Sequence, residues 1–303
     1  MYHRMLETIL SAALLLAACE PQTREEPPST DTGSPAAVAG QPDTRLDLFT
    51  DVPAPAAQLV FVGEQRASQM AAWPGAVFVP MSTFSVERDG IPNEFPPADS
   101  LAAKLAAAGV RGENVVIVGE PIPAGRAYAA FDYLGLGDRA VLLDGGLTAL
   151  GSPTDSARAR VTGADSAELK VDVREDLIVD AEWVHARLRD PNVAILDARP
   201  PAEFSGETPG RGITRPGHIP GARNLFWQTL VRSPDDARLK DEAELRRLFQ
   251  EAGVDPGDTI VAYCRTGGQS SFLYAVARHL GYNVRLYDGS FIDWNRTDYP
   301  VAR

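Results

Sequence analysis

One cysteine of this chain lies where a nucleophile would be expected. Cys264 follows the β-branched run 259–263 and precedes Arg265-Thr266-Gly267-Gly268-Gln269, and a helical pattern begins at about Ser270. Two glycines let such a loop curl so that successive backbone N–H groups face inward, and a helix N-terminus adds free donors and a partial positive charge. A loop of this kind stabilises an anion and lowers the pKa of a thiol held within it. We therefore expect Cys264 to be a nucleophile near neutral pH.

The alternative for Cys264 is a small core residue at the end of a strand, a role that single cysteines often have. A packing role would not require a glycine-rich turn directly after the thiol, so this turn argues against that alternative. The first half of the chain offers an internal comparison, because its matching strand ends in Gly119 and continues as Glu120-Pro121-Ile122-Pro123, with neither a thiol nor an anion-binding loop. We expect one active half and one inactive half.

The two halves are related by an internal repeat. Three segments of the first half return in the same order in the second half, which gene duplication explains most simply. They are Ala108-Gly109-Val110, 114–118 and Asp144-Gly145-Gly146-Leu147, which return as Ala252-Gly253-Val254, 259–263 and Asp288-Gly289-Ser290-Phe291.

Each copy alternates short β-branched runs with helical patterns, which predicts an α/β fold in which a parallel sheet is flanked by helices. In the second copy we expect strands at 193–197, 259–263 and 284–287. Asp180 and Asp241 are positioned to cap helices, the first helix running through Trp183 and Leu188. We expect the two copies to form separate domains at 46–150 and 175–303, joined by a linker at 151–174.

Length, composition and charge narrow the possible functions. At 303 residues the chain can hold two domains, and 44% hydrophobic with 23% charged residues is typical of globular proteins. With a net charge of −12, the chain has no excess of positive charge that could neutralise the phosphates of a nucleic acid. We therefore expect no nucleic-acid partner.

The N-terminal segment has the pattern of an export signal. An apolar run at 9–18 follows Arg4 and ends in Leu16-Ala17-Ala18-Cys19, which resembles the lipobox of bacterial lipoproteins. The resemblance implies a signal peptide at 1–19, a lipid on Cys19 as the only membrane contact, and a place in the bacterial cell envelope facing the periplasm or exterior. A plain secretory signal and a buried N-terminal helix are the alternatives.

Residues 20–45 are rich in Pro, Ser, Thr and Gly and are expected to be a flexible tether, because they cannot bury enough apolar surface to offset the entropy of ordering. If Cys19 carries lipid, Cys264 is the one thiol left in the chain. An internal disulfide is then impossible, even at an oxidising location.

From about residue 46 to the C-terminus the chain resembles the rhodanese family, in particular its two-domain thiosulfate and 3-mercaptopyruvate sulfurtransferases. Four motifs in the second copy carry the resemblance, and together they are highly specific. They are Leu196-Asp197-Ala198-Arg199, Gly217-His218-Ile219-Pro220-Gly221-Ala222, the loop from Cys264 to Gln269, and Tyr287-Asp288-Gly289-Ser290-Phe291-Ile292-Asp293-Trp294. The resemblance implies a bacterial lipoprotein form of the family with two rhodanese-like domains.

What the resemblance implies is a double displacement. The Cys264 thiolate would take a sulfane sulfur from thiosulfate, mercaptopyruvate or another persulfide, and pass it to cyanide or a thiol. No metal and no organic cofactor is implied. The candidates for binding the donor are Arg265, Thr266, Gly267, Gly268, Gln269, Ser270 and Arg211.

Four further residues are expected to support the site from its edges. Asp197 and Arg199 are expected to form an internal ion pair beneath the loop. His218 is expected to shape a turn at the edge of the pocket. Trp294 is expected to contribute packing.

Several positions depart from the family pattern. Glu203 stands where the family usually has a substrate-binding arginine, Thr266 where thiosulfate enzymes often have lysine, and Arg265 where mercaptopyruvate enzymes favour a small neutral residue. Mercaptopyruvate enzymes draw an acid and a histidine from the first domain, and the equivalent positions here are Glu64 and Ala72, so this relay is expected to be broken. On balance these departures favour thiosulfate or a persulfide as donor.

Two other functions remain open. A phosphatase of the same fold would need a seven-residue loop ending in arginine, whereas six residues on from Cys264 the chain has Ser270. A non-catalytic lipoprotein that keeps the fold as a sulfur-carrying or protein-binding module is the second alternative, and the degenerate first half and Glu203 give it weight.

Overall fold

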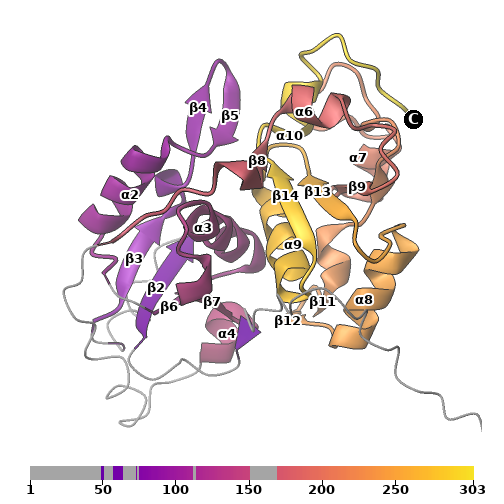
Figure 1. Cartoon of the computed structure of the whole chain (residues 1–303). Helices are drawn as coiled ribbons and strands as arrows, with labels where there is room; N and C mark the ends of the chain where they lie inside the picture. The colour runs from indigo at the N-terminus through magenta and orange to yellow at the C-terminus, as the bar shows by residue number, and fades with distance from the viewer. Residues whose placement is uncertain (1–48, 51–56, 64–72, 74, 112–113, 151–168) are drawn as a thin grey trace, which may run out of the picture. The chain divides into compact units, whose positions relative to one another are not determined.

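Two parallel sheets of five strands form the framework of the protein (Figure 1). The computed structural model describes residues 49–50, 57–63, 73, 75–111, 114–150 and 169–303. The predicted signal peptide, tether and most of the linker lie outside these residues, as do Cys19, Glu64 and Ala72. The predicted domain boundaries stay a prediction.

The two sheets have the same topology. Read from corresponding edges, the strand orders are β1-β7-β6-β2-β3 and β8-β14-β13-β9-β10, with every pairing parallel. The first sheet comprises β1 (Phe49–Thr50), β2 (Gln58–Gly63), β3 (Val77–Pro80), β6 (Val115–Val118) and β7 (Ala140–Leu143). The second comprises β8 (Ile178–Val179), β9 (Val193–Asp197), β10 (Arg223–Asn224), β13 (Thr259–Tyr263) and β14 (Asn283–Tyr287). The matching orders are what duplication predicts.

Helices cover the sheets, so the predicted α/β class with two domains of helix-flanked parallel strands is confirmed. The α-helices are α2 (Ala98–Ala107), α3 (Pro121–Tyr133), α4 (Gly146–Leu150), α6 (Ala181–His185), α7 (Pro201–Phe204), α8 (Glu242–Glu251), α9 (Gly268–His279) and α10 (Ser290–Trp294). The 3-10 helices are η1 (Met81–Thr83), η2 (Gly137–Arg139), η3 (Glu175–Leu177) and η4 (Trp227–Leu230). Within the described part of the chain, no helix is both long and apolar enough to cross a bilayer.

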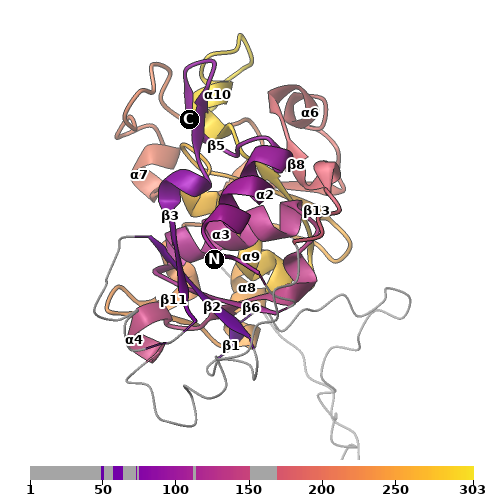
Figure 2. The same cartoon turned by 90° about the vertical axis from the view of Figure 1, so that its left-hand side faces the viewer.

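Two short antiparallel hairpins complete the fold. One joins β4 (Val86–Arg88) to β5 (Ile91–Glu94), and the other joins β11 (Val231–Ser233) to β12 (Asp236–Leu239). The first hairpin lies beside α10, and a side chain added at Gly90 in its turn would meet the Arg296 guanidinium (Figures 1 and 2).

Local signals set the starts of two helices. Asp180 accepts a hydrogen bond from the backbone of Trp183, and Asp241 accepts one from Glu244, both at 2.8 Å. The helix after Asp180 is shorter than predicted, ending at His185 instead of passing Leu188. The backbone N–H groups of Arg187, Leu188 and Asp190 bond to carbonyls three residues back, so the chain tightens into turns.

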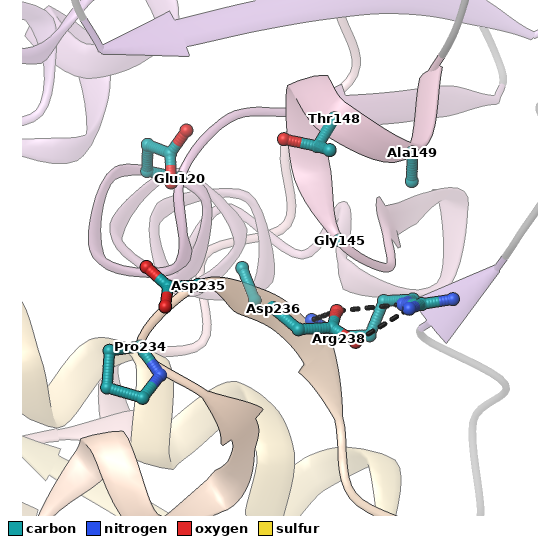
Figure 3. A pocket seen from close by; sticks show the side chains of 9 residues that line it. Glu120, Gly145, Thr148, Ala149, Pro234, Asp235, Asp236 and Arg238 are labelled. Carbon is teal, nitrogen blue, oxygen red and sulfur yellow. Dashed lines mark hydrogen bonds and ion pairs between the residues drawn. The ribbon is translucent and has the colours of Figure 1, made fainter.

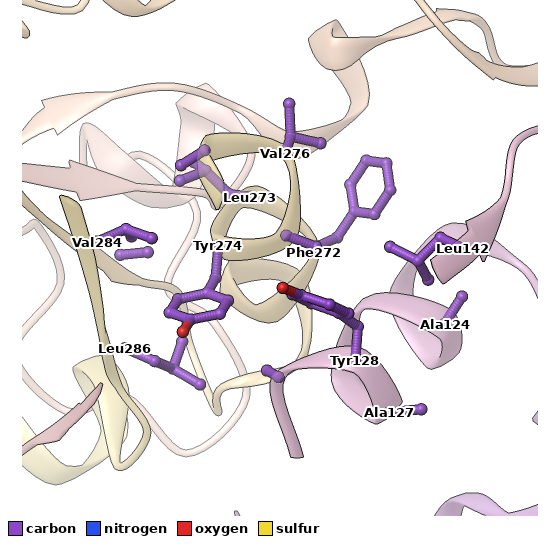
Figure 4. Packing of buried hydrophobic residues seen from close by; sticks show 14 of the residues in the cluster. Ala124, Ala127, Tyr128, Leu142, Phe272, Leu273, Tyr274, Val276, Val284 and Leu286 are labelled. Carbon is purple, nitrogen blue, oxygen red and sulfur yellow. The ribbon is translucent and has the colours of Figure 1, made fainter. Parts of the chain in front are cut away.

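The contact between α3 and α9 joins the two halves (Figure 4). One hydrophobic cluster includes residues from both helices, among them Tyr128 and Tyr274, whose rings lie 6.5 Å apart. The helices approach closely at Gly125, where a Cβ atom would lie 2.5 Å from the Cα of Phe272. Because no side chain fits there, this position requires glycine.

Candidate active site

Cys264 occupies the carboxyl end of β13, the central strand of the second sheet. Hydrogen bonds to the start of α10 hold it there, because its backbone N–H donates to Ser290 Oγ at 3.2 Å and its carbonyl accepts from Phe291 at 3.0 Å. Parallel sheets of this kind place their ligand sites beyond the carboxyl ends of the strands. The thiol therefore lies where sequence reasoning placed it.

The sulfur of Cys264 is buried. The residue is 1% exposed and belongs to the apolar cluster that also includes Ala198 and Phe272. Among the described residues, the sulfur accepts a hydrogen bond from the Ser270 hydroxyl at 3.5 Å, and the expected ring of backbone amides stays a prediction. The thiol therefore has almost no contact with solvent in this structure.

The Ser270 hydroxyl can respond to the charge on sulfur. Its oxygen lies 3.1 Å from the carbonyl of Gly267 and 3.5 Å from the sulfur of Cys264, and a hydroxyl has only one proton to donate. The Ser271 hydroxyl also donates to the Gly267 carbonyl, at 2.6 Å. With that carbonyl satisfied by Ser271, the Ser270 proton is available to a thiolate.

The loop after Cys264 leads into α9, which begins at Gly268 and not at Ser270 as predicted. Gly267 is the N-cap and has a left-handed backbone with a φ of 87°. A residue with a side chain would be strained there, and its Cβ would lie 2.8 Å from a carboxylate oxygen of Asp288. Thr266, Gly268 and Gln269 are partly exposed at the mouth of the loop.

Arg265, the predicted anion-binding residue, is already paired. Its Nη1 atom lies 3.3 Å from Oε1 of Glu203, and its side chain is 38% exposed. The other carboxylate oxygen of Glu203 is buried and has no hydrogen-bond partner. Glu203, which stands where the family usually has an arginine, thus offsets the positive charge of Arg265 at the loop.

Asp197 and Arg199 form a buried ion pair at the end of β9. Arg199 Nη2 lies 2.6 Å from Asp197 Oδ2 and also donates to the carbonyl of Gly217 at 2.8 Å. Burial alone would lower the pKa of Arg199, but the Asp197 carboxylate outweighs it and the pKa is raised. Burial, followed by the Asp197 charge, raises the pKa of Tyr263 well above its usual value. The pair is therefore structural support beneath the loop.

The remaining predicted residues are Arg211, His218 and Trp294, and they differ in exposure. Arg211 is exposed to solvent in the segment between α7 and β10. His218 stacks on Phe204 with ring centroids 3.8 Å apart, and its backbone pairs with Ala302. Trp294 is fully buried, and its indole N–H donates to the carbonyl of Pro300 at 2.9 Å. His218 and Trp294 thus hold the C-terminal segment in place.

Sequence reasoning missed a group of residues from the first half. Asn93 of β5 donates from Nδ2 to the carbonyl of Thr266 at 2.5 Å, and Arg126 of α3 pairs with Asp288 at the end of β14. A signal for Arg126 was present, because it is a charged residue among alanines and aromatics in a helix whose one other charged residue is Asp132.

Two cavities in the described part of the protein lie near the junction of the halves. One, of about 420 Å³, is lined by Glu120, Gly145, Thr148, Ala149, Pro234, Asp235, Asp236, Ala237 and Arg238 (Figure 3). Arg238 is paired with Asp236 at 2.6 Å, and Glu120 and Asp235 also line the cavity. The lining is therefore acidic and unsuited to an anionic sulfur donor. The other, of about 430 Å³, is lined in part by Glu94, Asp180, Asp288 and Asp293. Neither cavity contains Cys264, and the described residues hold no group of three or more side chains that could bind a metal.

Comparison with known proteins agrees with this geometry. The family described as "Rhodanese-like domain" matches residues 180–297. The chain is 30% identical over 262 residues to a thiosulfate sulfurtransferase of Azotobacter vinelandii, across 84% of this chain and 94% of that protein. It is also 30% identical over 235 residues to a 3-mercaptopyruvate sulfurtransferase of Escherichia coli strain K12, across 75% of this chain and 82% of that protein.

Among solved structures, the Tum1 protein from Saccharomyces cerevisiae has the same fold, with a TM-score of 0.66 at 20% identity over 82% of this chain and 92% of that one. The similarity in sequence extends over most of the chain, the fold is shared, and a cysteine lies at the end of a strand in the second domain. The chain belongs to the rhodanese family of sulfurtransferases.

Proposed function

We propose that the protein is a thiosulfate-type sulfurtransferase that works through a persulfide on Cys264. The observation that carries the proposal is the position of this thiol, at the end of the central strand of the second domain with the Ser270 hydroxyl at 3.5 Å from its sulfur. The first domain has Gly119 at the matching strand end, so it lacks a nucleophile there.

The reaction has two displacements. The Cys264 thiolate attacks the sulfane sulfur of thiosulfate, the sulfur–sulfur bond of the donor breaks, and sulfite leaves with the bonding electrons. Cyanide or a thiolate then attacks the outer sulfur of the persulfide, and the cysteine thiolate is the leaving group. Atoms and charges balance in both steps without an outside oxidant or reductant.

Charge at the loop shapes the choice of donor. Thiosulfate is a dianion, and Arg265 is the cation nearest to the thiol in sequence, but Glu203 competes for it at 3.3 Å. Mercaptopyruvate is the alternative donor, and relatives of both kinds are about equally similar to this chain. Ala72, in place of a histidine, favours thiosulfate.

A non-catalytic role is the second candidate, because Cys264 is 1% exposed and Arg265 is paired. Turnover distinguishes the two roles. Purified full-length protein should form thiocyanate from thiosulfate and cyanide, and its intact mass should increase by one sulfur after thiosulfate alone. Cys264→Ser should abolish both signals without changing the thermal midpoint greatly. If wild-type protein gains no sulfur from thiosulfate, mercaptopyruvate or glutathione persulfide, the enzymatic proposal is wrong.

We also propose that the protein is anchored in the bacterial cell envelope by lipid on Cys19. The apolar run at 9–18 supports this, because it ends in Leu16-Ala17-Ala18 directly before Cys19. Mass spectrometry of the mature protein should find a diacylated N-terminal cysteine, and Cys19→Ser should move the protein out of the membrane fraction. A mature protein that retains residues 1–18 would refute the anchor.

A further inference from the structure

The inactive first half reaches into the loop that carries Cys264. Asn93, at the end of the first hairpin, donates from Nδ2 to the carbonyl of Thr266 at 2.5 Å, across 173 residues of sequence. Its Oδ1 atom accepts from the Ser85 hydroxyl at 2.5 Å. A carbonyl can only accept, so the two contacts together determine which way the Asn93 amide faces.

The contact from Asn93 determines the orientation of one peptide in the loop. The peptide between Thr266 and Gly267 is planar and trans, so its C=O and N–H groups point in opposite directions. With the Thr266 carbonyl held toward the first half, the Gly267 N–H must face away from it. Loss of the Asn93 contact frees this peptide to rotate, because Gly267 lacks the side chain that would restrict it.

Arg126 holds Asn93 and the loop together. It is fully buried, and its guanidinium pairs with Asp288, donates to the backbone carbonyl of Asn93 and lies 3.4 Å from the Ser271 hydroxyl. The same guanidinium lies over the ring of Phe95, 3.6 Å from its centroid. One side chain of the first half therefore contacts the hairpin, the end of β14 and the first turn of α9.

Two of the three non-glycine residues with a left-handed backbone in the described part of the chain lie at this contact, Asn93 with a φ of 66° and Ser290 with a φ of 57°. The third, Asp89, lies in the turn between β4 and β5. Asn93 holds Thr266, and Ser290 accepts from the backbone N–H of Cys264. Such conformations persist only where the surrounding structure imposes them, and they cluster at functional sites.

We propose that Asn93 and Arg126 are positioning residues, through which the first domain sets the conformation of the Cys264 loop for sulfur transfer. This inference rests on the proposed role of Cys264 as the nucleophile. It assigns a function to the half that has no nucleophile of its own.

The chain offers a matched control in Asp132, on the same helix as Arg126. Asp132 is fully buried and accepts from Tyr274 at 2.7 Å, Arg278 at 3.1 Å and Arg174 at 2.6 Å, so it also joins the halves. It lies six residues further along α3, roughly 9 Å away, and none of these contacts involves the loop. Asp132→Asn therefore weakens the same interface without touching the peptide that Asn93 holds.

The test compares Asn93→Ala and Arg126→Gln with Asp132→Asn in the full-length protein. Single-turnover persulfide formation from thiosulfate, followed by intact mass, should slow about tenfold or more in the first two variants, because small misplacements of reacting groups are costly. The rate of persulfide formation in Asp132→Asn should stay within about twofold of the wild-type rate, even if the thermal midpoint of this variant falls as far as the midpoints of Asn93→Ala and Arg126→Gln. Equal rates in all four proteins would overturn the proposal, and so would an equal loss in all three variants.

A second readout separates this inference from the proposed function. The rate at which iodoacetamide alkylates Cys264 between pH 6 and pH 10 should change its pH profile in Asn93→Ala and keep it in Asp132→Asn. This measurement needs no sulfur donor. If wild-type protein accepts no sulfur, the proposed function fails, whereas an unchanged alkylation profile in Asn93→Ala would refute the positioning role alone.

Discussion

Removing the negative charge of Glu203 is expected to improve the use of thiosulfate. Glu203→Gln frees Arg265 for the donor and removes a charge that repels a dianion. At the 3.3 Å separation of the pair, Coulomb's law gives ~1.3 kcal/mol in water and ~5 kcal/mol at an effective dielectric constant of 20. The Arg265 side chain is 38% exposed, so solvent screening places the net effect near the lower value, about 1 kcal/mol.

That free energy corresponds to about a fivefold increase in kcat/KM for thiosulfate. The assay is thiocyanate formation over a range of thiosulfate concentrations, repeated at low and high salt, and the gain should shrink as ions screen the charge. Glu207→Gln is the matched control, because Glu207 is an exposed acid of the same segment. A neutral alkyl persulfide should show little change with either variant. An unchanged or lower kcat/KM for thiosulfate in Glu203→Gln would refute the reasoning.

Three further predictions concern stability. Asp197→Ala leaves its buried arginine partner unpaired and should lower the free energy of unfolding by about 3–5 kcal/mol in urea titrations; no change would show that the pair is not structural. Gly125→Ala should cost about 1–3 kcal/mol in the same assay, because the new Cβ would lie 2.5 Å from the Phe272 Cα; full stability would contradict that tight contact. Burial, then the Asp288 charge, raises the pKa of Glu94 above 4.5, so its contribution to stability is lost as the pH rises above that value. Glu94→Gln should flatten this part of the pH dependence of the urea midpoint, and parallel curves for the two proteins would be evidence against the raised pKa.

The elements around Cys264 could be predicted from local sequence. The buried β-branched run at 259–263 forms β13 with the predicted bounds, and Asp180 and Asp241 cap the helices that follow them. Such features depend on residues a few positions apart, so a sequence contains the information for them. The repeat indicated duplication, and the shared strand order of the two sheets agrees with that interpretation.

The surroundings of the thiol were decided only by the tertiary structure. The contact between Asn93 and Thr266 spans 173 residues, and that between Arg126 and Asp288 spans 162. No local pattern encodes such pairs, because they form only when the two halves dock along α3 and α9. The burial of Cys264, which is 1% exposed, was likewise not evident from the local sequence. Sequence alone therefore identified Cys264 as the candidate nucleophile, whereas long-range packing determined which residues of the first half contact its loop.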